Sequence, residues 1–235
     1  MRIAIVSDIH GNLLALDAVM TDLQKYAPDE VWCAGDVGWG GPWASECIAR
    51  VREAGWTAIK GNTDIWITGD PQGLESDEQR GELEGVAAAH NISKDDAEWL
   101  INLPLGHHGP GSILLVHGTP RSPFKAPLPW DPASEFRDYE GQATIVVYGH
   151  VHHGFVRRLS DGTIVANAGS VGLPLDGLTA CYILIDQQGG EWCIRHRRVP
   201  FDRRAGLAQA RTIGGPVGER FLKYMEMAEN ETEAR

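Results

Sequence analysis

Residues 1–66 alternate between short apolar runs and longer segments whose apolar residues recur at helical spacing. The apolar runs are Arg2–Val6, Val31–Ala34 and Thr57–Lys60. Between them, residues 12–26 and Ala44–Ala54 place apolar side chains three and four positions apart, which indicates helices. Strands that alternate with helices form βαβ units, and the strands of such units run parallel in one sheet. This part of the chain is therefore restricted to an α/β fold.

The middle of the chain continues this pattern less regularly. Residues 69–81 are rich in Gly, Pro and charge, so we expect a mobile or weakly helical connection there. A capping box at Ser93–Asp96 predicts a helix that extends to about Asn102. Two further buried strands are expected at Ser112–Val116 and Thr144–Tyr148. Five prolines in residues 118–132 predict an irregular surface loop between these strands.

After His150 the pattern changes to short strands joined by hairpin signals, which predicts an antiparallel meander. The expected strands are Phe155–Leu159, Thr163–Asn167, Thr179–Asp186 and Glu191–Val199. Helices at 203–211 and 217–228 could close the fold. With no repeat and no low-complexity linker, we expect one domain over residues 1–225, followed by a polar tail at 226–235.

Charge and hydropathy limit the possible partners. The net charge of −11 argues against an open groove for duplex nucleic acid, because basic side chains supply most of that affinity. It does not exclude an anionic substrate, because a bound metal reverses the local sign. The apolar run at the N-terminus is too short for a signal-peptide core, and no run approaches the ~20 residues of a membrane span. We therefore expect a cytoplasmic protein.

Five short polar motifs follow directly after five of the expected strands. They are S-D-I-H-G-N at 7–12, G-D-V at 35–37, G-N-T-D at 61–64, H-G at 117–118 and G-H-V-H at 149–152. Ligands of open α/β sheets bind at the carboxyl ends of the strands. We therefore expect seven side chains to converge on one rim: Asp8, His10, Asp36, Asn62, His117, His150 and His152.

These side chains are the donors that first-row divalent metals prefer. The set holds two carboxylates, four imidazoles and one amide oxygen, with no thiolate, which suits Mn, Fe, Zn or Ni. Seven donors exceed the four of one tetrahedral ion, so two ions sharing a bridging carboxylate fit better. Each motif alone also has a structural explanation: Gly35-Asp36 is typical of a turn, and His117 could be a core histidine. All five motifs in this order favour the metal site.

The ordered set D-x-H, G-D, G-N-x-D, H-G and G-H-x-H resembles that of the calcineurin-like metallophosphoesterase superfamily. Within it, the chain is similar to the small prokaryotic branch of phosphodiesterases and diadenosine-tetraphosphatase-like phosphatases. The resemblance covers about residues 1–200 and includes the segments Asn167–Gly172 and Arg198–Asp202. It implies a four-layer α/β/β/α sandwich with two mixed sheets.

The resemblance also implies a set of roles. Asp8, His10, Asp36 and His152 would hold the first metal ion. Asp36 would bridge to the second ion, which Asn62, His117 and His150 complete, and a hydroxide between the ions would attack phosphorus in line.

The chain departs from the superfamily pattern at Thr63, where many members carry a histidine that is thought to assist the leaving group. A threonine hydroxyl donates a hydrogen bond but is no proton donor near pH 7. We therefore expect weak activity on alkyl phosphomonoesters and a preference for activated diesters, nucleotide anhydrides or a substrate that brings its own acid. His90 could replace the missing histidine, or it could be an ordinary histidine on a helix face.

Candidate catalytic residues are therefore Asp36, Asn62, Thr63 and His90. Candidate substrate contacts are Asn62, Thr63 and Arg121, although Arg121 could equally be a solvated surface cation. Ser170, in the Gly169–Gly172 turn, could present N–H groups to an anion or only shape the turn.

The function expected from these residues is hydrolysis of a phosphodiester, a phosphoanhydride or an activated phosphomonoester by a phosphatase or phosphodiesterase with a dinuclear centre. The substrate would be a small phosphorylated molecule, with a nucleotide as one option. The alternative is a catalytically weak scaffold that uses the same fold to bind proteins. Such a scaffold would be free to lose ligands, whereas all seven positions here hold competent donors. A nuclease is disfavoured because no basic groove with interleaved aromatic residues is evident.

Overall fold

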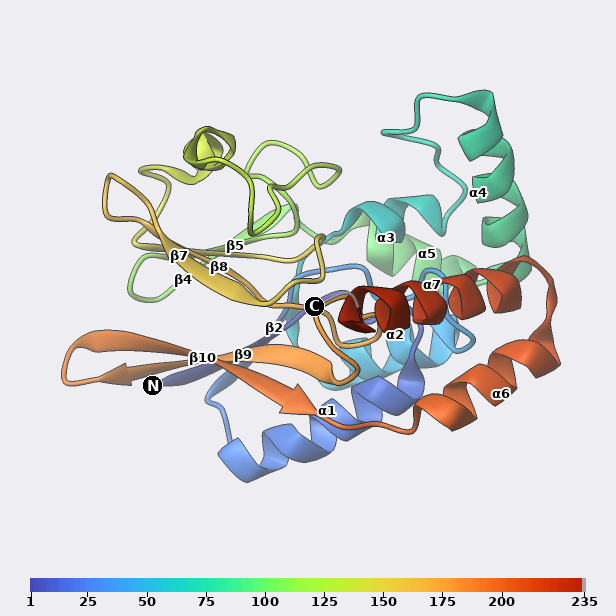
Figure 1. Cartoon of the computed structure of the whole chain (residues 1–235), viewed down its shortest axis with the longest axis horizontal. Coiled ribbons are helices and arrows are strands. Elements are labelled where there is room, and N and C mark those ends of the chain that lie inside the picture. Colours follow the sequence, from blue (N-terminus) through green and yellow to red (C-terminus); the bar gives the residue numbers. More distant parts are fainter. Residues whose placement is uncertain (234–235) are drawn as a thin grey trace.

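The computed structural model contains two five-stranded β-sheets, both of mixed direction (Figure 1). Residues 1–233 are described. The first sheet has the order β10-β9-β1-β2-β3 and comprises β1 (Arg2–Val6), β2 (Glu30–Cys33), β3 (Thr57–Ala58), β9 (Ala180–Gln188) and β10 (Glu191–Val199). In it, β1, β2 and β3 run parallel, whereas β9 is antiparallel to both β1 and β10.

The second sheet has the order β4-β5-β6-β8-β7. It comprises β4 (Gly106–Gly109), β5 (Ile113–Val116), β6 (Ile145–Tyr148), β7 (Phe155–Arg158) and β8 (Ile164–Asn167). Strands β5, β6 and β8 run parallel, and the edge strands β4 and β7 are antiparallel to their neighbours.

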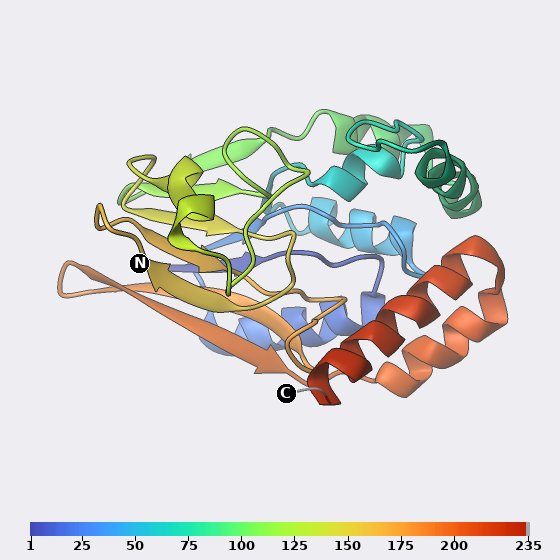
Figure 2. The same cartoon turned by 45° about the horizontal axis from the view of Figure 1, so that its top comes forward.

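Seven α-helices and one 3-10 helix accompany the sheets in residues 1–233. They are α1 (Leu13–Tyr26), α2 (Ala44–Glu53), α3 (Asn62–Trp66), α4 (Asp77–His90), α5 (Lys94–Ile101), the 3-10 helix η1 (Ala133–Tyr139), α6 (Arg203–Ile213) and α7 (Gly215–Glu233). Both views place the α6–α7 pair beyond the ends of the sheets (Figures 1 and 2). None of the helices in residues 1–233 combines the length and the apolar content that crossing a bilayer requires.

Alternation along β1 explains how the layers pack. Ile3 and Ile5 belong to a buried cluster that also contains Ile113 and Ile145 of the second sheet. Ala4 and Val6 point to the opposite face and pack with apolar residues of α1 and α2. The outer face of the second sheet is covered by η1 through residues such as Phe136. The expected sandwich with two mixed sheets is therefore confirmed, and its fourth layer is one 3-10 helix and the proline-rich loop.

The predicted antiparallel meander after His150 is wrong. The hairpin of β7 and β8 stays in the second sheet, whereas β9 and β10 return to the first sheet, where β9 pairs with β1. A hairpin signal shows that two strands pair with each other. It does not show which sheet the pair joins. The run Ala180–Asp186 is buried throughout, which fits a strand flanked on both edges and covered on both faces.

Three further segments differ from expectation. Part of the connection at 69–81 is the first turn of α4, where Ser76 and Gln79 form a capping box. Strand β4 was not predicted, because its sequence Gly-His-His-Gly has no apolar alternation. The expected polar tail at 226–235 is helical as far as Glu233, and residues 234–235 lie outside the described residues. Upstream in α7, Phe221 and Met225 are buried one turn apart and anchor the helix.

Candidate metal centre

Five loops that leave the carboxyl ends of strands in both sheets build one buried polar cluster. The loops after β1, β2 and β3 come from the first sheet, and those after β5 and β6 come from the second. Six of the seven predicted donors are buried, and His150 is partly exposed. The carboxylate of Asp8 accepts hydrogen bonds from the backbone N–H of His150, at 3.1 and 3.2 Å, which joins the two sheets at this point.

The backbone carries most of these donors in an unusual conformation. Among the described residues, eight that are not glycine have positive φ, and five of them are candidate donors: Asp8, His10, Asp36, His150 and His152. Positive φ is uncommon for such residues and is concentrated at functional sites, where the surrounding structure enforces it. The sequence gives no direct sign of this feature, although Asp and His tolerate the left-handed region better than most residues.

Three imidazoles are oriented by backbone carbonyls. Nδ1 of His10 lies 2.9 Å from the carbonyl oxygen of Trp39, that of His117 lies 2.7 Å from Ala34, and that of His152 lies 2.8 Å from Leu173. Because a carbonyl oxygen only accepts, each Nδ1 donates its proton in a hydrogen bond, and Nε2 is the ring nitrogen that faces the cluster. This is the usual orientation of histidines that bind metals.

The Nε2 atoms converge on one another and on side-chain oxygens. Nε2 of His10 lies 3.1 Å from Nε2 of His152, which lies 3.2 Å from Oδ1 of Asp8. Nε2 of His117 lies 2.9 Å from Oδ1 of Asn62 and 3.4 Å from Oδ1 of Asp36.

Carboxylates and imidazoles packed this closely are stabilised by a positive charge among them, whether a proton on a ring nitrogen or a metal cation. Two groups of donor atoms each lie within 4.8 Å of one another: Asp8, His10 and His152, and Asp8, Asp36 and His117. The donor set therefore fits divalent cations.

The electrostatics of the side chains support the same conclusion. Burial opposes protonation of His117, but the neighbouring carboxylate of Asp36 outweighs it and raises the pKa of His117 to about 10. Burial also opposes protonation of His152, whose pKa is raised by Asp8. In contrast, burial and the adjacent imidazoles lower the pKa of His10 and of His150 to about 4. Each half of the cluster thus stabilises one positive charge.

Asp64 links two of the loops. Its carboxylate accepts hydrogen bonds from the backbone N–H groups of Asp36 (2.8 Å), Val37 (2.9 Å) and Gly61 (2.8 Å). Burial and the nearby charge of Asp36 raise the pKa of Asp64 to about 6. Ser170 acts in a similar way, because its hydroxyl donates to the carbonyl oxygen of Asp8 (2.7 Å).

The remaining candidate residues lie in different surroundings. Thr63 is buried beside Asp36, to which its backbone N–H donates (2.9 Å), and its hydroxyl has no hydrogen-bond partner among residues 1–233. Nε2 of His90 on α4 accepts from the backbone N–H of Gly40 (2.9 Å). The Arg121 side chain is 79% exposed and lies 3.7 Å from a carboxylate oxygen of Asp138. The roles predicted for His90 and Arg121 stay predictions.

Known proteins resemble this chain over most of its length. Residues 1–190 match the model of the calcineurin-like phosphoesterase superfamily domain. The chain is 28% identical over 222 residues to protein MJ0912 of Methanocaldococcus jannaschii, covering 85% of this chain and 88% of that protein.

Two further relatives extend the comparison. The crystal structure of a metallophosphoesterase from Sphaerobacter thermophilus has 26% identity and a TM-score of 0.75, with 97% and 99% of the two chains covered. A symmetrical bis(5′-nucleosyl)-tetraphosphatase of Thioalkalivibrio sulfidiphilus is 29% identical over 113 residues, covering 47% of this chain and 42% of that protein.

Proposed function

The chain belongs to the calcineurin-like phosphoesterase superfamily, and we propose that it is a phosphohydrolase that depends on two divalent metal ions. The observation that carries this proposal is the convergence of Nε2 of His10, His117 and His152 with the carboxylates of Asp8 and Asp36 in two small groups of donor atoms. The intact donor set also argues against the protein-binding scaffold, which has no need of it.

The proposed ligands divide between the two ions around Asp36. Asp8, His10 and His152 hold one ion with Asp36, and Asn62, His117 and His150 complete the other. The two oxygens of Asp36 support this division, because Oδ2 lies 3.7 Å from Nε2 of His10 and Oδ1 lies 3.4 Å from Nε2 of His117. The donor types admit Mn, Fe, Zn or Ni. Bound ions of this kind lower the pKa of water and stabilise charge on phosphoryl oxygens.

The chain's own residues restrict the substrate. The buried Thr63 hydroxyl has no partner among the described residues, so it is free to donate a hydrogen bond to a phosphoryl oxygen. It cannot protonate a leaving group near pH 7. We therefore assign the protein to phosphodiesters, phosphoanhydrides or activated monoesters, whose leaving groups depart without a proton.

A small phosphorylated molecule, with a nucleotide as the first option, is the proposed substrate. The tetraphosphatase relative supports this option, although its match covers less than half of either chain. The net charge of −11 argues against duplex nucleic acid. A cytoplasmic location stays a prediction from the N-terminal sequence.

The test is Mn²⁺-dependent hydrolysis of bis(p-nitrophenyl) phosphate by the wild type and by the Asp36→Asn variant. We expect the variant to lose at least about 100-fold in kcat/KM, because changes even in groups that only support metal ligands cause losses of about 10- to 100-fold. The exposed Asp95→Asn variant is the matched control and should keep wild-type activity. Unchanged activity in Asp36→Asn would remove the two-metal proposal.

A further inference from the structure

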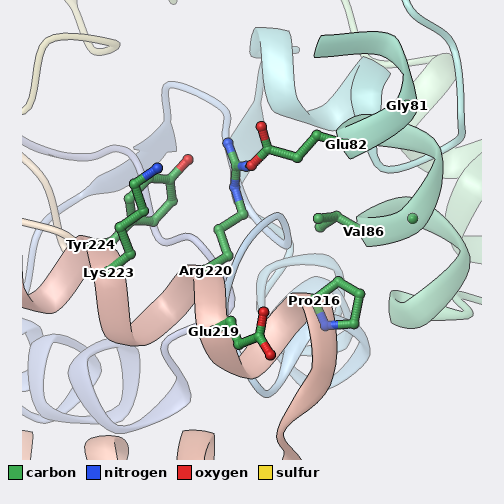
Figure 3. Close-up of a pocket in the computed structure, with 9 residues that line it drawn as sticks. Gly81, Glu82, Val86, Pro216, Glu219, Arg220, Lys223 and Tyr224 are labelled. Atoms are coloured by element: carbon green, nitrogen blue, oxygen red, sulfur yellow. The ribbon is translucent and has the colours of Figure 1, made fainter. Parts of the chain in front are cut away.

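A cavity of about 560 Å³ lies between α4 and α7, beside the candidate metal centre. Figure 3 shows Glu82 on α4 and Arg220 and Tyr224 on α7 among the residues that line it. Helix α7 lies outside residues 1–190, which match the family model, so the family match does not account for this wall of the cavity.

The cavity adjoins the metal centre through two of its lining residues. The Tyr224 ring lies edge-on to the His10 ring, with centroids 6.3 Å apart. The guanidinium of Arg220 lies 5.2 Å above the ring of Trp39, whose carbonyl oxygen orients His10. The cavity and the metal centre are therefore neighbours that share the Tyr224 ring as a common wall.

Fixed contacts define one wall of the cavity. Nη1 of Arg220 donates to Oε1 of Glu82 at 2.6 Å, so α7 is tied to α4 across the cavity. The guanidinium also lies between two aromatic rings, 5.2 Å from that of Trp39 and 4.9 Å from that of Tyr224. Arg220 is therefore held in place by an ion pair and by two aromatic rings, one of which is Tyr224.

The opposite wall is left open by glycines. Gly81 and Gly85 lie one turn apart inside α4, and both line the cavity. A Cβ added at either position would meet nothing within 4 Å. Glycine destabilises the interior of a helix. In α4, two glycines nevertheless lie at positions where larger side chains would fill the cavity.

The charges of the cavity point to an uncharged polar ligand. The two cations, Arg220 and Lys223, are balanced by two anions, Glu82 and Glu219. These four charges sum to zero, so the cavity has no net charge to attract a second phosphate, and its carboxylates can accept from an amino group or a hydroxyl. Arg220 covers one face of the Tyr224 ring, which leaves the other face for a planar heterocycle to stack on. The volume lies within the ~300–1,000 Å³ of typical small-molecule sites.

We propose that the α4–α7 cavity binds the nucleoside of a nucleotide substrate while the phosphate lies at the metal centre. The inference rests on the proposed function and deepens it, because it assigns the substrate class to a site. The heterocycle stacks on Tyr224, and its amino group or the ribose hydroxyls donate to Glu82 or Glu219.

Binding of unphosphorylated nucleosides tests the cavity without the metal reaction. Adenosine, guanosine, cytidine and thymidine are titrated separately into the metal-free protein by calorimetry. We expect at least one to bind with a Kd of about 1 mM or tighter. Tyr224→Ala should weaken that binding by about 5- to 150-fold, the range found for loss of base stacking, whereas Tyr224→Phe should retain it. No binding by any of the four nucleosides overturns the proposal.

A matched pair of substrates then tests the site in the reaction. The p-nitrophenyl ester of a nucleoside 5′-monophosphate is compared with methyl p-nitrophenyl phosphate, which has the same leaving group but no nucleoside. We expect the ratio of their kcat/KM values to fall at least tenfold in Gly85→Leu, which fills the cavity. Ala88→Leu, whose side chain lines a separate hollow and not this cavity, should keep the ratio. An unchanged ratio in Gly85→Leu overturns the proposal.

The two arms separate the possible failures. Hydrolysis of neither ester by the Mn²⁺-loaded wild type would contradict the proposed function, and the nucleoside titrations would still decide the cavity. Hydrolysis of both esters without preference for the nucleotide, together with no nucleoside binding, would contradict the cavity alone.

Discussion

Replacing Gly61 with alanine removes no functional group, yet we expect it to disable the candidate metal centre. The backbone of Gly61 has φ −93° and ψ 175°, which alanine adopts without strain. Its added Cβ would lie only 2.0 Å from Oδ1 and 2.6 Å from the backbone nitrogen of Asp36. The effect of the substitution is therefore steric and is directed at the proposed bridging carboxylate.

The size of the effect follows from these distances. Real Cβ contacts are essentially never shorter than 3.0 Å, so the Asp36 oxygen must retreat by about 1 Å. The same oxygen accepts a hydrogen bond from the backbone N–H of Thr63 and lies 3.4 Å from Nε2 of His117. A misplacement of 1 Å in a catalytic site lowers the rate by about 10²-fold. Loss of the buried hydrogen bond lowers the free energy of unfolding by about 1–3 kcal/mol.

The assay compares kcat/KM for bis(p-nitrophenyl) phosphate at saturating Mn²⁺ and the free energy of unfolding in urea. Gly177→Ala is the control, because its Cβ would make only an ordinary contact, 3.8 Å from Nη1 of Arg198. Activity of Gly61→Ala within threefold of the wild type would show that the position of Asp36 does not limit the reaction.

Three further predictions concern residues around the centre. In Asp64→Asn, the amide nitrogen must face at least one backbone N–H of the linked loops. Urea titrations should therefore show that the free energy of unfolding falls by about 1–3 kcal/mol. An unchanged midpoint would contradict the linking role. Burial and the charge of Arg220 lower the pKa of His90 to about 4, against about 6.5 in the unfolded chain. Between these two values the unfolded state binds more protons than the folded state. The free energy of unfolding therefore falls as the pH decreases from 6.5 to 4. His90→Gln keeps an acceptor for Gly40 and should make that decline shallower by up to about 1.4 kcal/mol per pH unit, whereas equal slopes would refute the assignment. Because Thr63 supplies no proton, the wild type should hydrolyse an aryl phosphodiester at least about 100-fold faster than an alkyl phosphomonoester, and comparable rates would remove the argument.

Much of the fold and of the cluster could be predicted because both depend on local patterns. The apolar run of β1, the helix α1 and the motif of Asp8 and His10 succeed one another in the chain. Parallel strands must bring the motifs at their carboxyl ends together, and the structure does place all seven predicted donors in one cluster.

The features that escaped prediction depend on contacts between distant segments. The crossing of β9 to the first sheet is decided by its pairing with β1, which no hairpin signal reveals. Orientation of His10 by the carbonyl oxygen of Trp39 is a backbone contact and leaves no trace in residue types. The approach of Tyr224 to His10 joins residues more than two hundred positions apart.

The number of divalent ions bound by one chain tests the central claim most directly. Mn²⁺ is titrated by calorimetry into the full-length, metal-free protein, and the metal content of the dialysed complex is then measured by mass spectrometry. Because the seven proposed donors form two groups that share Asp36, we expect two ions to bind per chain. One ion would contradict the shared bridging carboxylate, and none would contradict the metal centre altogether.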